Sequence, residues 1–325
     1  MDNPDIYYSN NLIEKTEKHV QYVPNRQLLK SYYKYRYLLL MLLPGMIYYL
    51  LFKYGPMYGL VVAFKDYRLM DGIMASPWVG LKYFKIVFGT TEFWTVFRNT
   101  LIISTYKLIV GFPAPIILAL LLNEISNTRF KKTIQTITYM PHFLSWVVLS
   151  GILINFLSPS IGPINALLRA LGMDPIFFVA DPQWFRSMIV ATSVWKEVGW
   201  GSIVYLAALA NVNVELYEAA VLDGAGKLKQ VIHITIPSIA PMIIIMLIFA
   251  IGGIVNDDFD QILNLYNPIV YSVGDVFSTY VYRMGLQNAL YSFSTAAGLF
   301  RNVIAFTLIV VTNYMSRKFS EYGLW

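Results

Sequence analysis

The sequence predicts an all-α, polytopic membrane protein, and three observations support this fold class. Of the 325 residues, 57% are hydrophobic and only 14% are charged, whereas a soluble domain carries about 25% charged residues. The mean hydropathy is +0.53, and six segments approach the ~20 apolar residues that a bilayer-spanning helix requires. The aromatic content, 16%, is also high, as expected where Trp and Tyr line membrane surfaces.

Turn signals and polar residues separate these six segments. Gly55-Pro56 and Gly59 are expected to end the first span before a short apolar run at 61–64, and Gly162-Pro163 lies between the third and fourth spans. The fifth span is short, and its outer end leads into Asn256-Asp257-Asp258. The predicted spans cover residues 37–54, 100–122, 138–156, 185–210, 241–255 and 294–315.

Basic residues orient the predicted spans in the membrane. Thirteen of the 25 Lys and Arg residues lie in the N-terminal tail, in two short loops after the second and fourth spans, and after the sixth span. The alternate loops hold nine over far longer segments. Because cytoplasmic segments are enriched in Lys and Arg, both termini are expected in the cytoplasm. The first 30 residues contain no apolar run, so no cleaved signal peptide is expected.

Several other classes of site are not favoured by the composition. The chain contains no cysteine, and its three histidines, His19, His142 and His233, show no metal-ligand spacing, so no metal site is expected. No catalytic pair lies inside the spans, which argues against an intramembrane enzyme. The net charge of +6 is spread over loops and indicates membrane topology rather than nucleic-acid binding.

A polar island at 213–237 separates the fourth and fifth spans. Asn213 is placed to cap a helix whose first turn holds Glu215, where the helix dipole favours an anion. Asp223-Gly224 predicts a turn, a second short helix follows, and Pro237 opens the fifth span. An amphipathic helix–turn–helix of this kind either docks on a partner or lies on the lipid headgroups.

The spacing inside this island resembles a known coupling element. Glu218-Ala219-Ala220, three residues, Gly224, nine residues, Ile234, then Ile236-Pro237 is similar to the EAA loop of permeases in ATP-binding cassette (ABC) importers. Ile236, where that family prefers Leu, and Asn213, where it prefers Pro, are departures. Further segments resemble the complex-oligosaccharide subgroup, which includes the LplB family and alginate importers: 56–59, 63–67, 259–263, 265–268, 279–283 and 323–325.

The resemblance implies a domain plan and a set of partners. It implies the MalF-like, type I importer fold: a cytoplasmic tail at 1–35, a first span with an extracytoplasmic segment at 36–96, a core at 97–315 with the EAA loop at 211–237, and a tail at 316–325. A second permease (typically a different chain), two cytosolic ATPase subunits and an extracytoplasmic binding protein are expected, in the bacterial cytoplasmic membrane. The chain lacks a phosphate-binding Gly-rich loop, so ATP and Mg are expected in the partner ATPase, and no cofactor in this chain.

Six island residues are expected to couple the chain to that ATPase. By the resemblance, Glu218 pairs with an Arg of the ATPase, and Ala219 and Ala220 permit close approach. Gly224 is expected to make a turn with positive φ. Asp223 is expected either to cap the second helix or to be solvated. Pro237 completes the set.

Polar and aromatic residues of the fourth and fifth spans are candidates for the substrate path. By resemblance to the maltose permease, Ser193, Trp195 and Trp200 match positions that line a sugar site. Lys196, Glu197, Asn256, Asp257 and Asp258 are polar residues within or beside the spans, where such groups usually face a cavity or a partner. The alternatives are that the tryptophans belong to the interfacial belt and that Lys196 and Glu197 pair with other protein groups.

These residues leave the substrate's charge open. A lysine beside the path suits a uronic acid, whereas the acidic trio at 256–258 opposes one. The predicted function is therefore that of a permease subunit for oligosaccharide import. The alternatives are ABC import of another solute and a secondary transporter, although no internal repeat typical of the latter is found.

Overall fold

The computed structural model describes residues 34–253 and 258–319, with side chains to residue 314. Within this part every regular element is helical, which confirms the all-α class, and one antiparallel bridge joins Lys65 to Trp78. The chain divides into two compact units between Gly59 and Leu60. Four described helices are long and apolar enough to span a membrane, or five if one sharply bent pair is counted. The predicted count of six is therefore not exactly reproduced.

The first span is longer than predicted. Helix α3 (Arg36–Tyr49) continues through a π turn at Leu50–Tyr54 into a 3₁₀ helix at Gly55–Phe64. Gly55-Pro56 therefore does not end the helix. The Gly55 N–H bonds to the Leu50 carbonyl across the π turn, so the backbone changes its hydrogen-bond pattern just before the proline, which has no N–H to donate.

The second span is also extended, and it carries an irregularity at its centre. Helix α6 (Thr91–Tyr106) passes through a π turn at Lys107–Gly111 into α7 (Pro113–Glu124). The span was predicted to begin at residue 100, but the helix begins at Thr91. Phe93, in its first turn, is fully buried. A π turn inserts an extra residue and is frequent at functional sites.

The third predicted span is not straight. Helix α8 (Thr128–Tyr139) and a 3₁₀ turn at Met140–Phe143 are followed by α9 (Trp146–Phe156), with a bend of 105° between them. Pro141 removes a backbone donor, and the Ser145 hydroxyl starts a new helix by accepting a bond from the Val148 N–H. The span predicted at 138–156 is therefore interrupted by a sharp bend inside its range.

The fourth predicted span is observed as α11 (Pro182–Leu209), a helix of 28 residues. The Asp181 carboxylate caps it by accepting from the Gln183 N–H at 2.8 Å. Its length suits a membrane span, but it is not among the helices of sufficient apolar character. Arg186, Lys196 and Glu197 lower its hydropathy, and all three have protein partners.

The fifth and sixth predicted spans are longer than expected. Helices α13 (Lys227–Gln230) and α14 (Ile236–Gly252), joined by a π turn at Val231–Thr235, form one continuous helix, and α18 covers Tyr291–Phe319. Short elements complete the fold: α4 (Gly72–Ala75), α5 (Lys82–Gly89), α10 (Pro163–Ala170), α12 (Val214–Leu222), α15 (Phe259–Leu265), a 3₁₀ turn (Pro268–Val270), α16 (Tyr271–Gly274), α17 (Phe277–Tyr282) and a π turn (Arg283–Gln287).

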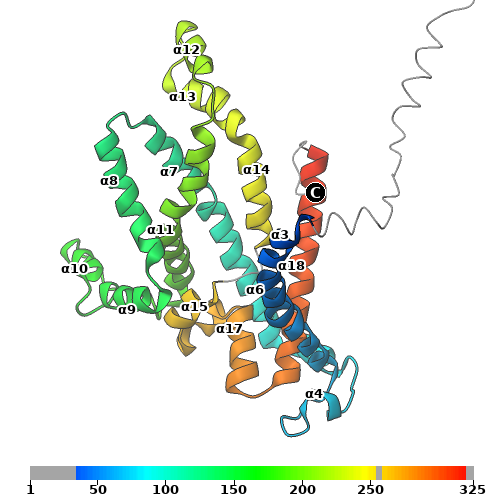
Figure 1. Cartoon of the computed structure of the whole chain (residues 1–325). Coiled ribbons are helices and arrows are strands. Elements are labelled where there is room, and N and C mark those ends of the chain that lie inside the picture. The colour runs from blue at the N-terminus through cyan, green and yellow to red at the C-terminus, as the bar shows by residue number, and fades with distance from the viewer. Residues whose placement is uncertain (1–33, 254–257, 320–325) are drawn as a thin grey trace, which may run out of the picture. The chain divides into compact units, whose positions relative to one another are not determined.

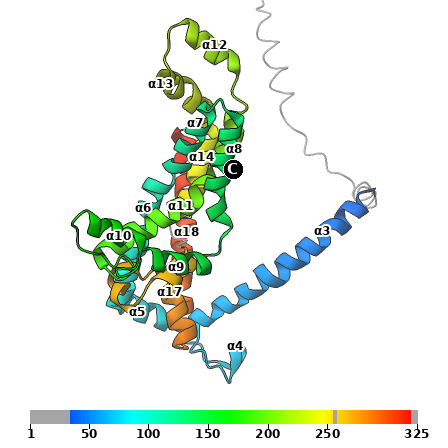
Figure 2. The ribbon, with the colours of Figure 1, turned by 90° about the vertical axis from the view of Figure 1, so that its left-hand side faces the viewer.

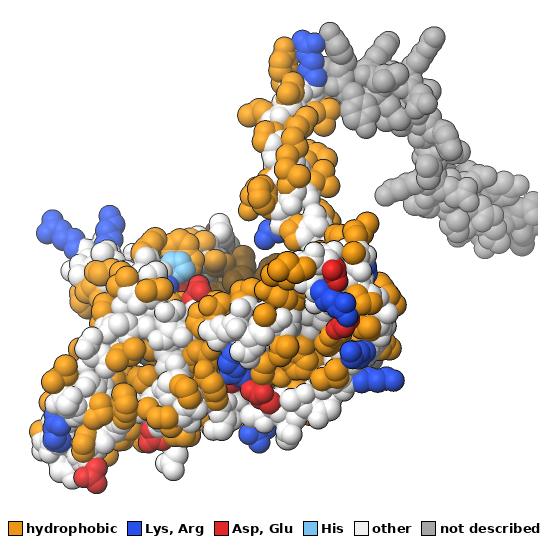
Figure 3. Space-filling model, turned by 90° about the horizontal axis from the view of Figure 1, so that it is seen from below, with side chains coloured by type: hydrophobic (Ala, Val, Ile, Leu, Met, Phe, Trp, Pro, Cys, Tyr) orange, Lys and Arg blue, Asp and Glu red, His pale blue; other side chains and the backbone are white. Residues whose placement is uncertain are grey.

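The second unit is a helix bundle with different structures at its two ends. Helices α6, α7, α11, α14 and α18 run along it, with α12 and α13 beyond one end and α15 to α17 at the other (Figures 1 and 2). Helix α11 packs closely against α7. Seen from the end that carries α17, hydrophobic and other side chains are mixed over the surface, and charged side chains are few and scattered (Figure 3).

Candidate functional site

The helix–turn–helix predicted at 213–237 is present at one end of the bundle. The Asn213 side chain caps α12 by accepting a bond from the Glu215 N–H at 3.0 Å. After α12, Gly224 has φ of +74°, which L side chains adopt only with strain. The predicted cap and the predicted positive φ are both confirmed. Glu218, Ala219, Asp223 and Gly224 are exposed, and Ala220 is half-buried.

Two further details concern Asp223 and Pro237. The N-cap residue of α13 is Gly226, no side chain caps that helix, and Asp223 is exposed, so of the two expectations for Asp223 the solvated one holds. Pro237 does not open a separate span, because the helix is continuous from Lys227 to Gly252. The π turn at Val231–Thr235 ends two residues before Pro237, so the backbone changes its hydrogen-bond pattern just ahead of the proline, which has no N–H to donate.

Specific contacts tie this helix–turn–helix to the bundle. The Tyr217 hydroxyl lies 3.0 Å from the Thr235 hydroxyl, and the Lys227 ammonium forms an ion pair with Glu124 at 3.0 Å. Between α12, α13 and the end of α7 lies an open groove of about 690 Å³, whose lining includes Glu218 and Leu222. The Leu222 side chain is 89% exposed. The Tyr217 contact therefore ties α12 to the π turn that precedes α14, and the Lys227 ion pair ties α13 to the end of α7.

A second site lies halfway along the bundle, where Ser193 and Asp258 approach each other. The buried Ser193 hydroxyl is 3.5 Å from the Asp258 carboxylate. The Lys107 ammonium donates to the same carboxylate at 2.6 Å and to the Gln261 side-chain oxygen at 2.7 Å. Asn256 and Asp257, the other members of the predicted acidic trio, lie outside the described residues.

Lys107 was missed by the sequence-based prediction. It lies in the π turn at Lys107–Gly111, at the centre of the second span, and its side chain is 18% exposed. A cation inside an otherwise apolar span is energetically costly and is usually functional or paired. The presence of Lys107 within 100–122 could therefore have identified it as a candidate site residue from the sequence.

A third group of polar side chains joins α11 to the bend between α8 and α9. The Lys196 ammonium donates to the His142 carbonyl at 2.7 Å and lies 3.3 Å from Glu197. The His142 ring nitrogen lies 2.8 Å from the other Glu197 oxygen. The His142 ring also stacks on Trp200, with ring centres 4.5 Å apart. Both charged residues therefore pair within this chain, and His142 is not isolated.

Both tryptophans keep nearly half of their surface exposed. Trp200 packs on His142 and Phe143 and is 45% exposed, and Trp195 is 49% exposed. Both lie in α11, a 28-residue helix about 42 Å long, Trp195 in its middle third and Trp200 nine residues before its end at Leu209.

Two cavities adjoin Lys107. The larger, about 340 Å³, lies between the second span, α11 and α14, and its lining is mainly apolar with Lys107 and Tyr205 among it. The smaller, about 60 Å³, is lined by Lys107, Ser193 and Glu197 among others. Within the described residues, no group of three His, Asp or Glu side chains is arranged to hold a metal ion.

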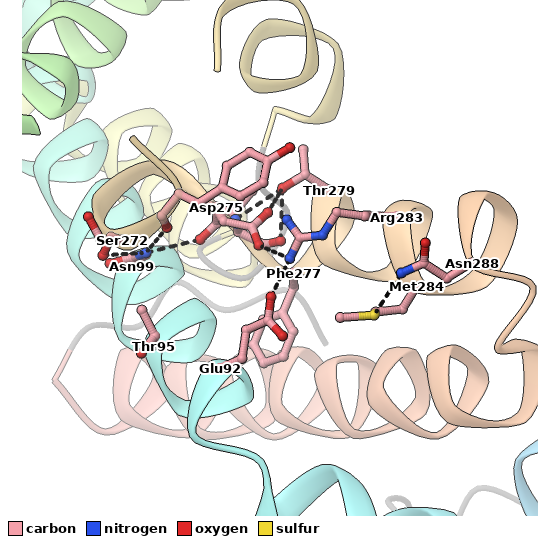
Figure 4. A network of polar contacts seen from close by, with 12 residues as sticks. Glu92, Thr95, Asn99, Ser272, Asp275, Phe277, Thr279, Arg283, Met284 and Asn288 are labelled. Carbon is pink, nitrogen blue, oxygen red and sulfur yellow. Dashed lines mark hydrogen bonds and ion pairs between the residues drawn. The ribbon is translucent and has the colours of Figure 1, made fainter. Parts of the chain in front are cut away.

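A buried ionic network stabilises the opposite end of the bundle from α12 (Figure 4). The Arg283 guanidinium bonds to Asp275 at 2.7 Å and to Glu92 at 2.6 Å. Thr279 donates to Asp275, and Asn99 donates to the Asp275 carbonyl. Burial raises the pKa of the Asp275 carboxyl, opposed by the bond from Thr279 and the charge of Arg283. This network holds α16 and α17 against the start of α6.

Comparison with known proteins decides what this arrangement is. Residues 111–321 match the family described as binding-protein-dependent transport system inner membrane component. The chain belongs to this family. It is therefore a transport permease of the inner membrane, as the EAA-type spacing predicted.

Relatives of this permease match over nearly its whole length. It is 47% identical over 290 residues to protein LplB of Bacillus subtilis (strain 168), covering 89% of this chain and 91% of LplB. It is 42% identical over 300 residues to the polygalacturonan/rhamnogalacturonan transport system permease protein YteP of the same organism, covering 92% and 94%.

Solved structures confirm the fold. A chain of a bacterial ABC transporter involved in import of the acidic polysaccharide alginate matches with a TM-score of 0.84 at 42% identity, over 90% of this chain and 99% of that chain. A chain of the bacterial alginate ABC transporter in complex with an alginate pentasaccharide-bound periplasmic protein matches with a TM-score of 0.85 at 41% identity, over 92% and 100%. The predicted importer-permease fold is thereby confirmed.

Proposed function

We propose that this permease forms half of the path of an ATP-driven importer for acidic oligosaccharides. The observation that carries the proposal is a polar site midway along the bundle, where Lys107, Ser193 and Asp258 meet and where Lys107 also lines a cavity of about 340 Å³. Two relatives support the substrate class, because one is named for polygalacturonan and rhamnogalacturonan transport and the other for import of an acidic polysaccharide. Import of neutral oligosaccharides or of a non-sugar solute is the alternative.

Coupling to ATP hydrolysis is assigned to the exposed helix–turn–helix. Glu218 is proposed to pair with a basic residue of a cytosolic ATPase, beside small Ala219 and Ala220. The groove of about 690 Å³ offers that partner an apolar wall at Val221 and Leu222. Because α13 continues into α14 without a break, rotation of α12 would be transmitted to the membrane helices.

The path itself is proposed to run past Ser193, Asp258 and Trp195. Trp195 offers an exposed aromatic face on which the C–H face of a sugar ring can stack. Asn256 and Asp257 stay in the proposed path by their place in the sequence. Lys196, Glu197 and Trp200 are proposed to position the bend at 140–145 beside the path, because their polar atoms and rings engage His142.

The proposed assembly contains a second permease chain, two ATPase subunits that use ATP and Mg, and an extracytoplasmic binding protein. The complex of a similar transporter chain with a periplasmic protein supports the last of these partners. Both termini of this permease are proposed to lie in the cytoplasm, on the same side as α12, because Lys and Arg are concentrated in those segments.

The test is uptake of labelled oligosaccharides by a strain that lacks this permease, with and without the gene restored. Galacturonate and alginate oligosaccharides are compared with their carboxyl-reduced, neutral counterparts. Loss of uptake confined to the acidic compounds supports the proposal. Loss confined to the neutral compounds refutes the acidic substrate class, and unchanged uptake of all of them refutes oligosaccharide import.

A further inference from the structure

The ion pair between Lys107 and Asp258 joins the centre of the second span to the segment before α15. The Lys107 ammonium lies 2.6 Å from one Asp258 carboxylate oxygen and 2.7 Å from the Gln261 side-chain oxygen. The two ionic partners differ in burial, because the Lys107 side chain is 18% exposed and that of Asp258 is 50% exposed.

Lys107 is held in place more firmly than Asp258. Its acceptor Gln261 is fully buried, and the Gln261 amide donates to the Ile189 carbonyl at 2.7 Å and to the Thr192 hydroxyl at 2.9 Å. Asp258 precedes α15 but its side chain does not cap that helix. The Asp258 carboxylate can therefore leave Lys107 without disrupting a helix end, whereas the ammonium and its Gln261 support remain.

A ligand in the path could reach Lys107, because the lysine lines both the cavity of about 340 Å³ and the cavity of about 60 Å³. The other charged side chains nearby already have partners. Glu197 is bonded to His142 and Lys196, and Arg186 is bonded to Asn99 and the Val273 carbonyl. The Lys196 counter-ion Glu197 is exposed to a similar degree, but Lys196 also donates to the His142 carbonyl and lines neither cavity. Lys107 lines both cavities, and its counter-ion Asp258 is half exposed.

The energetics favour exchange of one anion for another at this lysine. An ammonium that lost its counter-ion among apolar helices would carry a large desolvation penalty. A carboxylate from the substrate restores the pairing with the same charge, and the released Asp258 is already half in contact with solvent. The hydroxyl of a neutral sugar cannot supply that charge.

We propose that Lys107 binds a carboxylate of the oligosaccharide during its passage, and that Asp258 is the resident anion that the substrate replaces. Lys107 then selects for acidic sugars, while Asp258 keeps the lysine paired when no substrate is present. This inference rests on the proposed function, and it names the residue that would determine specificity for acidic sugars.

The test uses the complete importer, with its ATPases and binding protein, reconstituted in proteoliposomes and supplied with a labelled galacturonate oligosaccharide. Lys107→Met is expected to lower kcat/KM for uptake about tenfold or more, since hydrogen bonds between charged groups are strong. Lys107→Arg keeps the charge and is expected to stay within about threefold of wild type. Asp258→Asn is expected to raise kcat/KM about two- to fivefold, the range for a half-exposed ion pair. The exposed Lys85→Met is the matched control.

The double variant Lys107→Met with Asp258→Asn separates exchange from a purely structural pair. Under exchange it stays as impaired as Lys107→Met. A structural pair would instead make both single variants poor and the double variant near normal, and that pattern overturns the inference. Uptake by Lys107→Met equal to that of Lys85→Met also overturns it. If the wild-type importer takes up no acidic oligosaccharide, the proposed function itself fails.

Discussion

Gly199 of α11 is the point at which two helix backbones meet, and its replacement by alanine should separate them. A Cβ atom added at Gly199 would fall inside the van der Waals radius of the Thr138 carbonyl and 2.9 Å from the Tyr139 nitrogen. Ordinary contact begins at 3.4 Å. Because the obstructing atoms are backbone rather than a flexible side chain, α8 must move away from α11 by about 1 Å.

The size of the effect follows from that movement. Overpacking of this kind costs about 1–3 kcal/mol. The displacement also stretches the Lys196 bond to the His142 carbonyl and the contact between His142 and Glu197, now 2.7 and 2.8 Å. The higher helix propensity of alanine relative to glycine stabilises the folded state by at most about 1 kcal/mol. A net destabilisation is therefore expected.

The assay is thermal unfolding of the purified permease in detergent. Gly199→Ala should lower Tm by about 2–10 °C. Gly151→Ala is the matched control, since Gly151 also lies inside a helix but has open space where a Cβ would be, so its Tm should be unchanged or slightly higher. Equal Tm values for the two variants would show that the close approach of α8 and α11 is not required.

Three further predictions concern coupling and transport. Gly224→Val should reduce transport per ATP hydrolysed, because a β-branched residue at φ of +74° is strained by about 1–2 kcal/mol or more. Gly226→Val, at φ of −68°, is the control. Equal coupling in both variants would argue against a role of the Gly224 turn in coupling. Glu218→Lys should weaken association with the ATPase roughly tenfold in pull-down titrations by reversing an exposed charge; unchanged association removes Glu218 from the interface. Trp195→Ala should lower oligosaccharide uptake roughly fivefold with normal assembly, and unchanged uptake would exclude a stacking role.

The sequence predicted the helix–turn–helix well because its determinants are local. The cap by Asn213 and the turn at Gly224 each depend on residues within a few positions, and both are observed. The spacing from Glu218 to Pro237 also identified the family correctly. Asp223 was expected either to cap the second helix or to be solvated, and it is exposed, because α13 begins after Gly226.

The span boundaries were predicted less well. Gly55-Pro56 was expected to end the first span. Residues 138–156 were expected to form a single span. In the structure a π turn carries the helix through Pro56, whereas Pro141 and Ser145 produce a bend of 105°. Local propensity could not distinguish these outcomes, because a helix can accommodate a proline either by a change of hydrogen-bond pattern, as before Pro56, or by a break and a new helix start, as after Pro141.

Composition and short-range spacing by themselves determined that this chain is a helical membrane protein with an importer-type coupling loop. Hydropathy and capping act over a few residues, so they can be recognised along the chain. Only the tertiary structure decided which polar groups meet. Lys107 and Asp258 are 151 positions apart in the sequence, and His142 and Glu197 are 55 positions apart. Such pairs depend on how whole helices pack, and packing is a property of the bundle rather than of any one segment.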